Sequence, residues 1–508
     1  MSRRFLRSLH EEHLEEIGSL YERRIGLLDD VEIDHDDLVD LESRLEAHLD
    51  ALVVGAEPAL ELCAERALEA DPGELFGALC VFLRQGRQDL FEAALARFED
   101  GDDDEPSPAD DPDDDDEPPM EQLVASAKAE LGVGDPDDPD ANDDEAVPSG
   151  EDDDEVDPDA AAAADDDDDD EPFAPTPAQA LADALCADGP PSWQPFFERL
   201  LEPGNPAVVA AIARMMAVRG LRVGPKVVAA ADRLEPGPAL STVLWSLGRA
   251  RERTASPLLG RWAQRLRGDE AAIATLGMLR SGDPSILDFV LRLVPTHAWA
   301  VSLLAITGGP AVAPVLQSRL ERTEVSAEDI IAAGLFGEPS MVPRLLDLLE
   351  GSPEATTQAL YLITGAPVVE TVVEPVEEAG VLGTLANGEP DPRDRVEVQR
   401  LAHDPAPWRQ WWSANANALP SGRRHRLGRL ASPEVLGQTL HRFVLRRFVR
   451  QLAAEELGLR YAPQRDLDVD QWVGPQRAAL AGLSALRQSH AVIARADGAW
   501  VLGQALLR

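Results

Sequence analysis

The residues closest to a metal-binding pattern are two histidines near the start of the chain, in His10-Glu11-Glu12-His13. A zinc-binding helix of the protease type places its histidines four residues apart, so that both face one metal ion, with a glutamate beside the first. Here the spacing is three residues, and the sequence suggests no third ligand nearby. We therefore expect a solvated helix face rather than a zinc site.

A second pattern, formed by Asp100, Asp102 and Asp104, matches the first ligands of a calcium-binding EF-hand loop. The sixth position of such a loop needs glycine for its sharp turn, and Glu105 stands there instead. The phosphate-binding Gly-x-x-x-x-Gly-Lys pattern and the nucleophile pattern Gly-x-Ser-x-Gly do not occur in the sequence. We therefore expect no cofactor, no metal ion, no catalytic residue and no enzymatic activity.

Arginine is concentrated between residues 393 and 450, where twelve arginines stand against four acidic residues. Such a surface could contact phosphates, but the chain has a formal net charge of −48 and would be repelled by nucleic acid. The sequence predicts a surface for a protein partner here, and the alternative is an ordinary solvated arginine face. The candidate residues are Trp408, Trp411, Trp412, Arg423, Arg424, Arg426, Arg446, Arg447 and Arg450.

The acidic residues are concentrated in residues 101–171, which hold 34 of them and a single base, Lys128. This segment cannot bury enough apolar surface to offset its ordering entropy, so we predict a disordered acidic linker. Four apolar residues in it keep helical spacing, either as a stray helical turn or as a short helix that docks on a groove. They are Met120, Leu123, Val124 and Leu131. Opposite charges also favour docking of the linker on the arginine-rich region of the same chain.

A repeat of 26 to 29 residues organises the middle of the chain, with prolines that open each unit at Pro257, Pro284, Pro310, Pro339 and Pro367. Proline suits the first turn of a helix, and a preceding glycine can end the previous helix in a left-handed cap. Within one unit, apolar residues recur at helical spacing and form a single stripe. A helix pair of this length cannot bury its stripe alone, so neighbouring pairs must stack. Residues 172–367 therefore read as a helical repeat array.

The remaining segments complete an all-α fold, an α-solenoid of short helix pairs. Residues 1–100 predict five helices in an N-terminal bundle, and residues 368–407 predict a long irregular insertion. Residues 408–508 predict an arginine-rich helical C-terminal region, with one long helix or two over 433–458. A turn at Asp497-Gly498 between apolar runs predicts either a small β-hairpin or further helix.

The first residues show no apolar stretch of the kind that signal peptides carry, and the longest apolar run is too short to cross a bilayer. We therefore expect a soluble, cytoplasmic protein without membrane insertion. The cysteines lack the Cys-x-x-Cys spacing of metal and redox sites. We expect free, buried thiols at Cys63, Cys80 and Cys186.

The repeat units resemble short HEAT repeats. Two further stretches resemble an uncharacterised proteobacterial family of HEAT-repeat proteins: residues 37–60, beginning Asp-Leu-Val-Asp-Leu-Glu, and residues 426–457, beginning Arg-Leu-Gly-Arg-Leu-Ala. The acidic segment 101–171 departs from that family's pattern. Genes of the family often lie beside type VI secretion genes, which implies an accessory or adaptor role, and the family implies no catalytic residues.

The sequence thus predicts a protein–protein interaction scaffold or adaptor that binds through the curved face of its repeat array. One alternative is a HEAT-like enzyme of the lyase or DNA glycosylase type on the same scaffold. A glycosylase would need a basic groove in which an aromatic residue and a carboxylate converge. A third hypothesis is a purely structural spacer.

Overall fold

A computed structural model gives the fold of the chain. It describes residues 3–98 apart from 29, 31, 32, 34, 69 and 70, residues 175–375 apart from 203 and 281–284, and residues 395–507 apart from 443, 490–496 and 504. The predicted linker 101–171 and its apolar residues Met120, Leu123, Val124 and Leu131 lie outside the described residues. The described residues are mostly helical, with three small antiparallel strand pairs.

The N-terminal part forms the five helices expected from its sequence. They are α1 (Arg3–Leu27), α2 (His35–Val54), α3 (Ala56–Arg66), α4 (Pro72–Gln85) and α5 (Gln88–Ala94), followed by the 3-10 turn η1 (Leu95–Phe98). Helix α4 shows why the boundaries fall where they do. Asp71 caps its start by accepting hydrogen bonds from two backbone amides, Pro72 occupies the first turn, and Gly86 ends it in the left-handed conformation. Its middle is buried among the other four helices.

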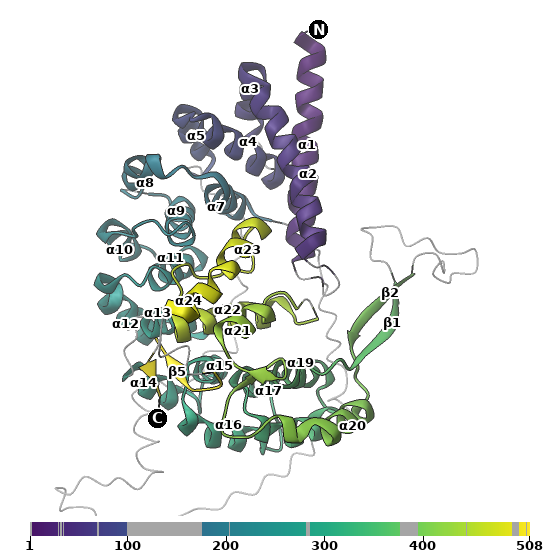
Figure 1. Cartoon of the computed structure of the whole chain (residues 1–508). Helices are drawn as coiled ribbons and strands as arrows, with labels where there is room; N and C mark the ends of the chain where they lie inside the picture. Colours follow the sequence, from purple (N-terminus) through teal and green to yellow (C-terminus); the bar gives the residue numbers. More distant parts are fainter. Residues whose placement is uncertain are drawn as a thin grey trace, which may run out of the picture. The chain divides into compact units, whose positions relative to one another are not determined.

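The repeat region forms a succession of short helices. They are α7 (Pro177–Asp188), α8 (Gln194–Leu200), α9 (Pro206–Val218), α10 (Pro225–Ala231), α11 (Pro238–Arg249), α12 (Ser256–Arg265), α13 (Gly268–Leu279), α14 (Ser285–Leu293), α15 (Ala298–Thr307), α16 (Ala313–Leu320), α17 (Ala327–Phe336), α18 (Val342–Leu348) and α19 (Pro353–Thr364). The odd-numbered helices from α7 to α19 contact one another in chain order. The even-numbered helices lie beside them (Figure 1).

Where a helical turn follows one of the unit prolines, the proline stands at its start, as expected. Pro310 and Pro339 open the 3-10 turns η5 (Pro310–Val312) and η6 (Pro339–Met341), and the next proline stands in the first turn of α16 or α18. A short 3-10 turn therefore stands before each of these two helices. Pro284 lies outside the described residues, and no helix follows Pro367. The apolar stripe is confirmed in the unit that begins at Pro339. Leu345 is 0% exposed there, and the other stripe residues, Val342, Leu346 and Leu349, are also buried.

Residues 368–407 were expected to be irregular, and this prediction is wrong at both ends of the segment. Strand β1 (Val369–Pro375) pairs with β2 (Arg395–Leu401) in antiparallel register, with Val369 opposite Leu401. Valine is a strong strand former and occurs in both strands, and in β2 it alternates with polar residues at the period of a strand. Helix α20 (Pro405–Asn415) then begins with Asp404 as its N-terminal cap.

The C-terminal part contains two helices where one or two were expected, α21 (Pro433–Thr439) and α22 (Arg447–Tyr461), and then α23 (Val473–Ala481) and α24 (Leu483–Ser489). Strands β3 (His425–Arg426) and β4 (Arg429–Leu430) form one small pair, and β5 (Val501–Leu502) and β6 (Ala505–Leu506) form another. The C-terminal strand pair therefore follows the Asp497-Gly498 turn instead of flanking it.

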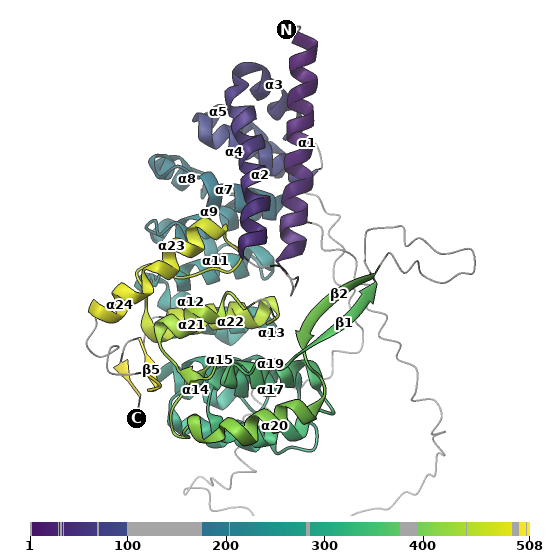
Figure 2. The same cartoon turned by 45° about the vertical axis from the view of Figure 1, so that its right-hand side comes forward.

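The C-terminal helices pack on the rest of the chain. Helix α22 contacts α15 of the repeat region, and α23 contacts α2 near the N-terminus (Figures 1 and 2). Residues 1–100 and 172–508 accordingly belong to one compact unit. Of the helices that the structure describes, none combines the length and the apolar character needed to cross a membrane.

Candidate functional site

The arginine-rich region does not form the surface that the sequence predicted. Trp408 is 1% exposed and donates its indole hydrogen bond to the carbonyl of Ala402 at 2.7 Å. Arg424, Arg426 and Arg450 are also buried, so neither a partner surface nor a solvated face includes them. The prediction is wrong for these four residues because the fold buries their side chains.

Three buried arginines surround a single carboxylate, and we call this group the arginine centre. Arg424, Arg426, Arg460 and Glu456 are all 0% exposed. Glu456 forms ion pairs with Arg424, with Arg426 at 2.6 Å and with Arg460 at 2.9 Å. The arginine centre therefore carries two more positive charges than negative ones.

The arginine centre also donates hydrogen bonds to the C-terminal ends of two helices of the repeat region. Arg460 donates to the carbonyl of Ala305 at 3.0 Å, near the end of α15, and Arg426 donates to that of Leu335 at 2.7 Å, near the end of α17. The last carbonyls of a helix lack partners within it and carry partial negative charge, so guanidinium groups stabilise them. These arginines therefore fasten the C-terminal part to the repeat region.

Strand β3 and the turn that follows it contact the ends of α17 and α19 through their backbone. The amide of His425 donates to the carbonyl of Gly337 at 2.7 Å, and that of Leu427 donates to the carbonyl of Leu362 at 2.8 Å. Gly337 and Gly365 end α17 and α19 in the left-handed conformation. A β-carbon at Gly337 would lie 2.4 Å from the carbonyl oxygen of His425, so only glycine permits this approach.

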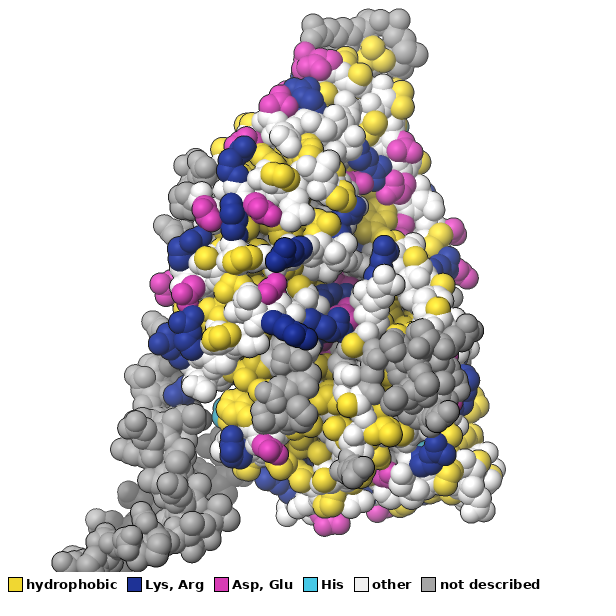
Figure 3. Space-filling view, turned by 60° about the vertical axis from the view of Figure 1, so that its left-hand side comes forward, with side chains coloured by type: hydrophobic (Ala, Val, Ile, Leu, Met, Phe, Trp, Pro, Cys, Tyr) yellow, Lys and Arg dark blue, Asp and Glu magenta, His cyan; other side chains and the backbone are white. Residues whose placement is uncertain are grey.

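The other predicted arginines lie nearer the surface. Arg446 forms an exposed ion pair with Glu354, Arg447 pairs with Asp470 at 2.9 Å, and Arg423 is exposed. Trp411 and Trp412 are partly buried. Figure 3 shows one face of the molecule, on which Lys and Arg side chains are spread among acidic, apolar and neutral ones. Docking of residues 101–171 on the arginine-rich region remains a prediction, because it involves residues outside the described part.

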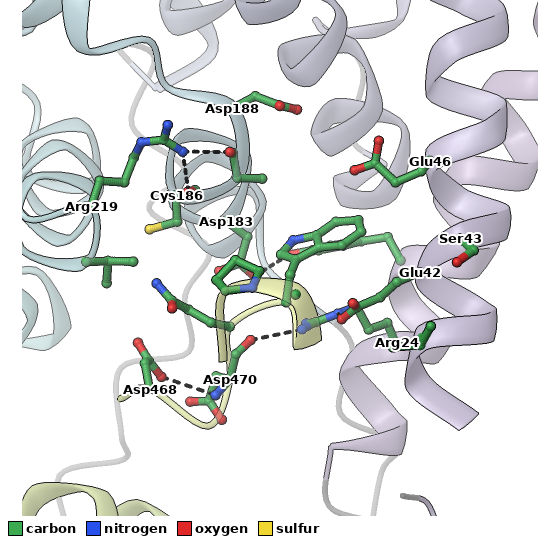
Figure 4. Close-up of a pocket in the computed structure, with 18 of the residues that line it drawn as sticks. Arg24, Glu42, Ser43, Glu46, Asp183, Cys186, Asp188, Arg219, Asp468 and Asp470 are labelled. Atoms are coloured by element: carbon green, nitrogen blue, oxygen red, sulfur yellow. Dashed lines mark hydrogen bonds and ion pairs between the residues drawn. The ribbon is translucent and has the colours of Figure 1, made fainter. Parts of the chain in front are cut away.

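A cavity of about 770 Å³ lies between the N-terminal helices, the repeat region and the C-terminal part (Figure 4). Its walls come from α1, α2, α7, α9, the start of α23 and the loop before α23. The ion pair of Arg24 with Glu42, at 2.9 Å, closes one side, and both side chains are under 10% exposed. Glu42 also accepts a hydrogen bond from the backbone amide of Val473 at 3.0 Å, and Arg24 donates to the carbonyl of Asp470 at 3.1 Å.

Acidic side chains outnumber basic ones in the lining of this cavity, but two arginines outside the lining pair with four of them. Arg84 pairs with Glu46, Asp50 and Asp188, and Arg447 pairs with Asp470. Among the described residues, seven carboxylates and four guanidinium groups line it. Figure 4 shows the carboxylates of α2, of α7 and of the loop before α23 around the same space. The carboxylates are Glu42, Glu46, Asp50, Asp183, Asp188, Asp468 and Asp470, and the guanidinium groups are those of Arg24, Arg214, Arg219 and Arg477.

Asp183 lies on the α7 wall and accepts a hydrogen bond from the hydroxyl of Tyr21 at 2.9 Å. Burial raises the pKa of Asp183, while the nearby Arg214 and Arg24 lower it in part. Burial also raises the pKa of Glu42 on the opposite wall, and Arg24 offsets part of this shift. The cavity therefore disfavours the charged form of these two carboxylates.

Three aspartates in the loop before α23 alternate with apolar residues, and only one of them is left with an unused oxygen. Asp466 pairs with Arg280 at 2.6 Å and with Arg251 at 3.0 Å, which fixes the loop to the repeat region. Asp470 accepts from Arg447 and Gln451, and Arg447 contributes to the lowered pKa of Asp470. Asp468 accepts the amide of Asp470 on Oδ1, and its buried Oδ2 accepts no hydrogen bond from a described residue.

The cysteines are free, as expected, and Cys63 and Cys80 are buried. Cys186 is only partly buried and lines the cavity, where burial raises its pKa to about 12 and keeps it a thiol. A thiol of that pKa is a poor nucleophile at neutral pH.

The histidine pattern at the N-terminus is not a solvated face, which corrects the sequence-based expectation. His10 is buried against Gly55, where a β-carbon would lie 2.6 Å from its ring. His13 meets His48 of α2 instead, with 3.0 Å between their Nδ1 atoms. In the described part of the chain, no three His, Cys, Asp or Glu side chains are grouped in a way that could hold a metal ion.

The sequence analysis did not identify the cavity residues, because they come from stretches near residues 21–50, 183–219 and 468–477. One local signal was present, the Asp-Leu-Asp-Val-Asp run at 466–470, whose period does not fit a helix. Comparison with family models, with curated proteins and with solved structures gave no match. The molecule is thus characterised as a mostly helical protein with an acid-lined cavity, and its likeness to HEAT repeats rests on the repeat pattern alone.

Proposed function

We propose that this protein is a binding protein, an adaptor whose cavity receives a cationic side chain of a protein partner. The observation that carries the proposal is the unused oxygen of Asp468 in a cavity lined by carboxylates, most of which already pair with arginines. A buried carboxylate oxygen without a partner is costly, and a guanidinium or ammonium group would satisfy it. An arginine side chain fits best, because its planar group can meet two carboxylates at once.

The arrangement of the repeat helices supports an adaptor of the α-solenoid kind. Helices α7 to α19 contact their neighbours in chain order, as stacked repeats do. Part of the repeat region is covered by α22, which contacts α15, so we place the partner at the cavity rather than along the whole array. An accessory role in type VI secretion belongs to this proposal and rests on the family resemblance alone.

The enzyme alternative fits the cavity less well. A DNA glycosylase must attract phosphates, and a cavity with more carboxylates than guanidinium groups repels them. No feature of the cavity favours the lyase type, so the adaptor remains the function that we propose.

A small probe can stand in for the cationic side chain of the partner. N-acetyl-argininamide carries the proposed guanidinium group, and N-acetyl-citrullinamide has nearly the same shape without the charge. A ligand that binds only the folded state raises its melting temperature. We expect millimolar N-acetyl-argininamide, but not the citrulline compound, to raise the melting temperature of the full chain.

The acidic segment 101–171 could also attract the probe, so the decisive comparison uses variants in the cavity. Asp468→Asn leaves that segment unchanged and removes the charge from the unused oxygen. We expect it to abolish most of the arginine effect, whereas Glu92→Gln, outside the cavity, should retain it. An equal response of the parent and Asp468→Asn would show that the cavity does not bind the cation.

A further inference from the structure

The arginine centre has a charge imbalance opposite to that of the cavity, and it is fully enclosed. Arg426 lies on strand β3 and Arg424 directly precedes that strand, while Glu456 and Arg460 lie one turn apart on α22. All four side chains are 0% exposed. Three guanidinium groups share one carboxylate, and this leaves two positive charges without a matching acid inside the centre.

The hydrogen bonds of the three arginines show which of their nitrogen atoms lack an acceptor. Arg460 is satisfied, because Nε pairs with Glu456 at 2.9 Å, Nη1 donates to Val501 at 2.8 Å and Nη2 donates to Ala305 at 3.0 Å. Arg424 donates through Nε and Nη2, and Arg426 donates through Nη2 alone. The Nη1 atoms of Arg424 and Arg426, and Nε of Arg426, are buried and donate to no described residue.

The nearest other ionisable groups do not cancel the charge. Burial raises the pKa of the Tyr461 hydroxyl, and the charges of Arg424 and Arg460 lower it only in part. The hydroxyl therefore stays neutral. Asp497 and Glu434 act on Tyr461 as well, and both raise the pKa of its hydroxyl further.

Loss of protons does not remove the charge at neutral pH either. Burial, followed by repulsion from Arg460, lowers the pKa of Arg426 to about 9, and burial lowers that of Arg460 to a similar value. Both groups therefore remain protonated at pH 7, and with Glu456 they leave at least one positive charge in the centre. Burial, then Arg460 and Arg426, lower the pKa of Arg424 well below its usual value. Water could satisfy the unused donors, but it would leave the buried charge, and an uncompensated buried ion is strongly unfavourable.

We propose that the arginine centre binds a small monovalent anion, chloride in the cell, which accepts hydrogen bonds from the unused nitrogens of Arg424 and Arg426. Chloride is a single spherical ion, so donors from two side chains can reach it from different directions. The guanidinium group of Arg424 lies over the ring of Trp500, with Cζ 5.5 Å from the ring centroid. The anion would act as a structural ligand that fastens α22 and β3 to the repeat helices.

Thermal unfolding of the full chain tests this proposal. Chloride is titrated against gluconate at constant ionic strength, so that general screening does not change. We expect the melting temperature to rise by roughly 2–4 °C and then to level off as the site fills. Arg426→Met removes unused donors and one positive charge, and should lose this response. Arg446→Gln, which alters an exposed arginine, should keep it.

A melting temperature that does not depend on the anion would overturn the proposal, and so would a chloride response that survives in Arg426→Met. A larger effect of phosphate than of chloride at equal ionic strength would also overturn it, in favour of an oxyanion site. If Arg426→Met does not fold, crystals of the parent grown in bromide decide the question. We expect an anomalous peak within hydrogen-bonding distance of Arg424 and Arg426, and no such peak would refute the site.

Discussion

The acid-lined cavity and the arginine centre both include residues of the C-terminal stretch 424–477, yet carboxylates predominate in the lining of the first and guanidinium groups in the second. The cavity has an excess of carboxylates and an unused acceptor, whereas the arginine centre has an excess of guanidinium groups and unused donors. One is a space of about 770 Å³ that a side chain could enter, and the other is enclosed. The difference suggests a binding role for the first and a structural role for the second.

The loop that follows α22 connects the two regions. Glu456 and Arg460 lie on α22, and Asp466, Asp468 and Asp470 follow within the next ten residues. Asp466 is held by Arg280 and Arg251 of the repeat region. A substitution in the arginine centre could therefore shift the cavity wall through this loop. A substitution in the cavity would not touch the hydrogen bonds that the arginine centre makes to the ends of α15 and α17.

The largest effect is expected from Glu456→Gln, which removes the only carboxylate of the arginine centre. Three buried guanidinium groups would then face one another without an acid, and breaking a buried ion pair in this way costs about 3–5 kcal/mol. Chemical denaturation of the parent and the variant measures the loss in free energy of unfolding. A loss below about 1 kcal/mol would mean that Glu456 does not hold the centre together.

The second effect concerns pH and the contact between the N-terminal and C-terminal parts. The His35 ring packs edge-on against that of His441, with centroids 4.1 Å apart. Burial, then His441 and Arg477, lower the pKa of His35 to about 4. The folded state therefore binds fewer protons than the unfolded state between about pH 6.5 and 4, so stability is full above this window and falls as the pH drops through it.

We expect this contact to contribute about 2 kcal/mol to the loss of stability between pH 7 and pH 4.5. The raised pKa values of Asp183 and Glu42 act in the opposite sense, so the measurement must be a difference between proteins. His35→Phe keeps a ring but cannot titrate, and its stability should fall less steeply with acid. Identical pH profiles for the parent and His35→Phe would contradict the prediction. His297→Asn, at the start of α15, serves as the control.

A smaller effect of opposite sign is expected from Asp183→Asn in the cavity. Its surroundings disfavour the charged carboxylate, and the amide oxygen can still accept the hydrogen bond from Tyr21. We expect the free energy of unfolding at pH 7 to rise by between zero and about 1 kcal/mol. A large loss of stability would show that the cavity carboxylates serve the fold, as Glu456 does, and would weaken the proposed binding role.

The smallest effect is expected at the exposed pair of Glu354 and Arg446, whose side chains are 56% and 53% exposed. Exposed ion pairs contribute about 0–1 kcal/mol, and salt screens them. Glu354→Gln should therefore change stability by less than about 1 kcal/mol, and the change should vanish at high salt. A loss comparable to that in Glu456→Gln would remove the contrast between exposed and enclosed arginines.

The sequence by itself determined the local structure of this protein. Proline in first turns, the left-handed glycine Gly337 and the apolar stripe through Leu345 are local features, and the structure agrees with each. Helices over most of residues 1–100 and 172–367 followed from the same kind of pattern. The β1–β2 pair was missed because the alternating valines were outweighed by the prolines and polar residues beside them.

Only the tertiary structure decided which charged groups are buried and which groups meet. Arg423 and Arg424 are neighbours, yet one is exposed and the other is fully enclosed. The enclosed arginine is defined by partners far along the chain, the helix end at Phe336 and the carboxylate of Glu456. The cavity likewise joins three distant stretches. Burying a charge is favourable only where such partners converge, and that convergence is a property of long-range packing that no local pattern of residues encodes.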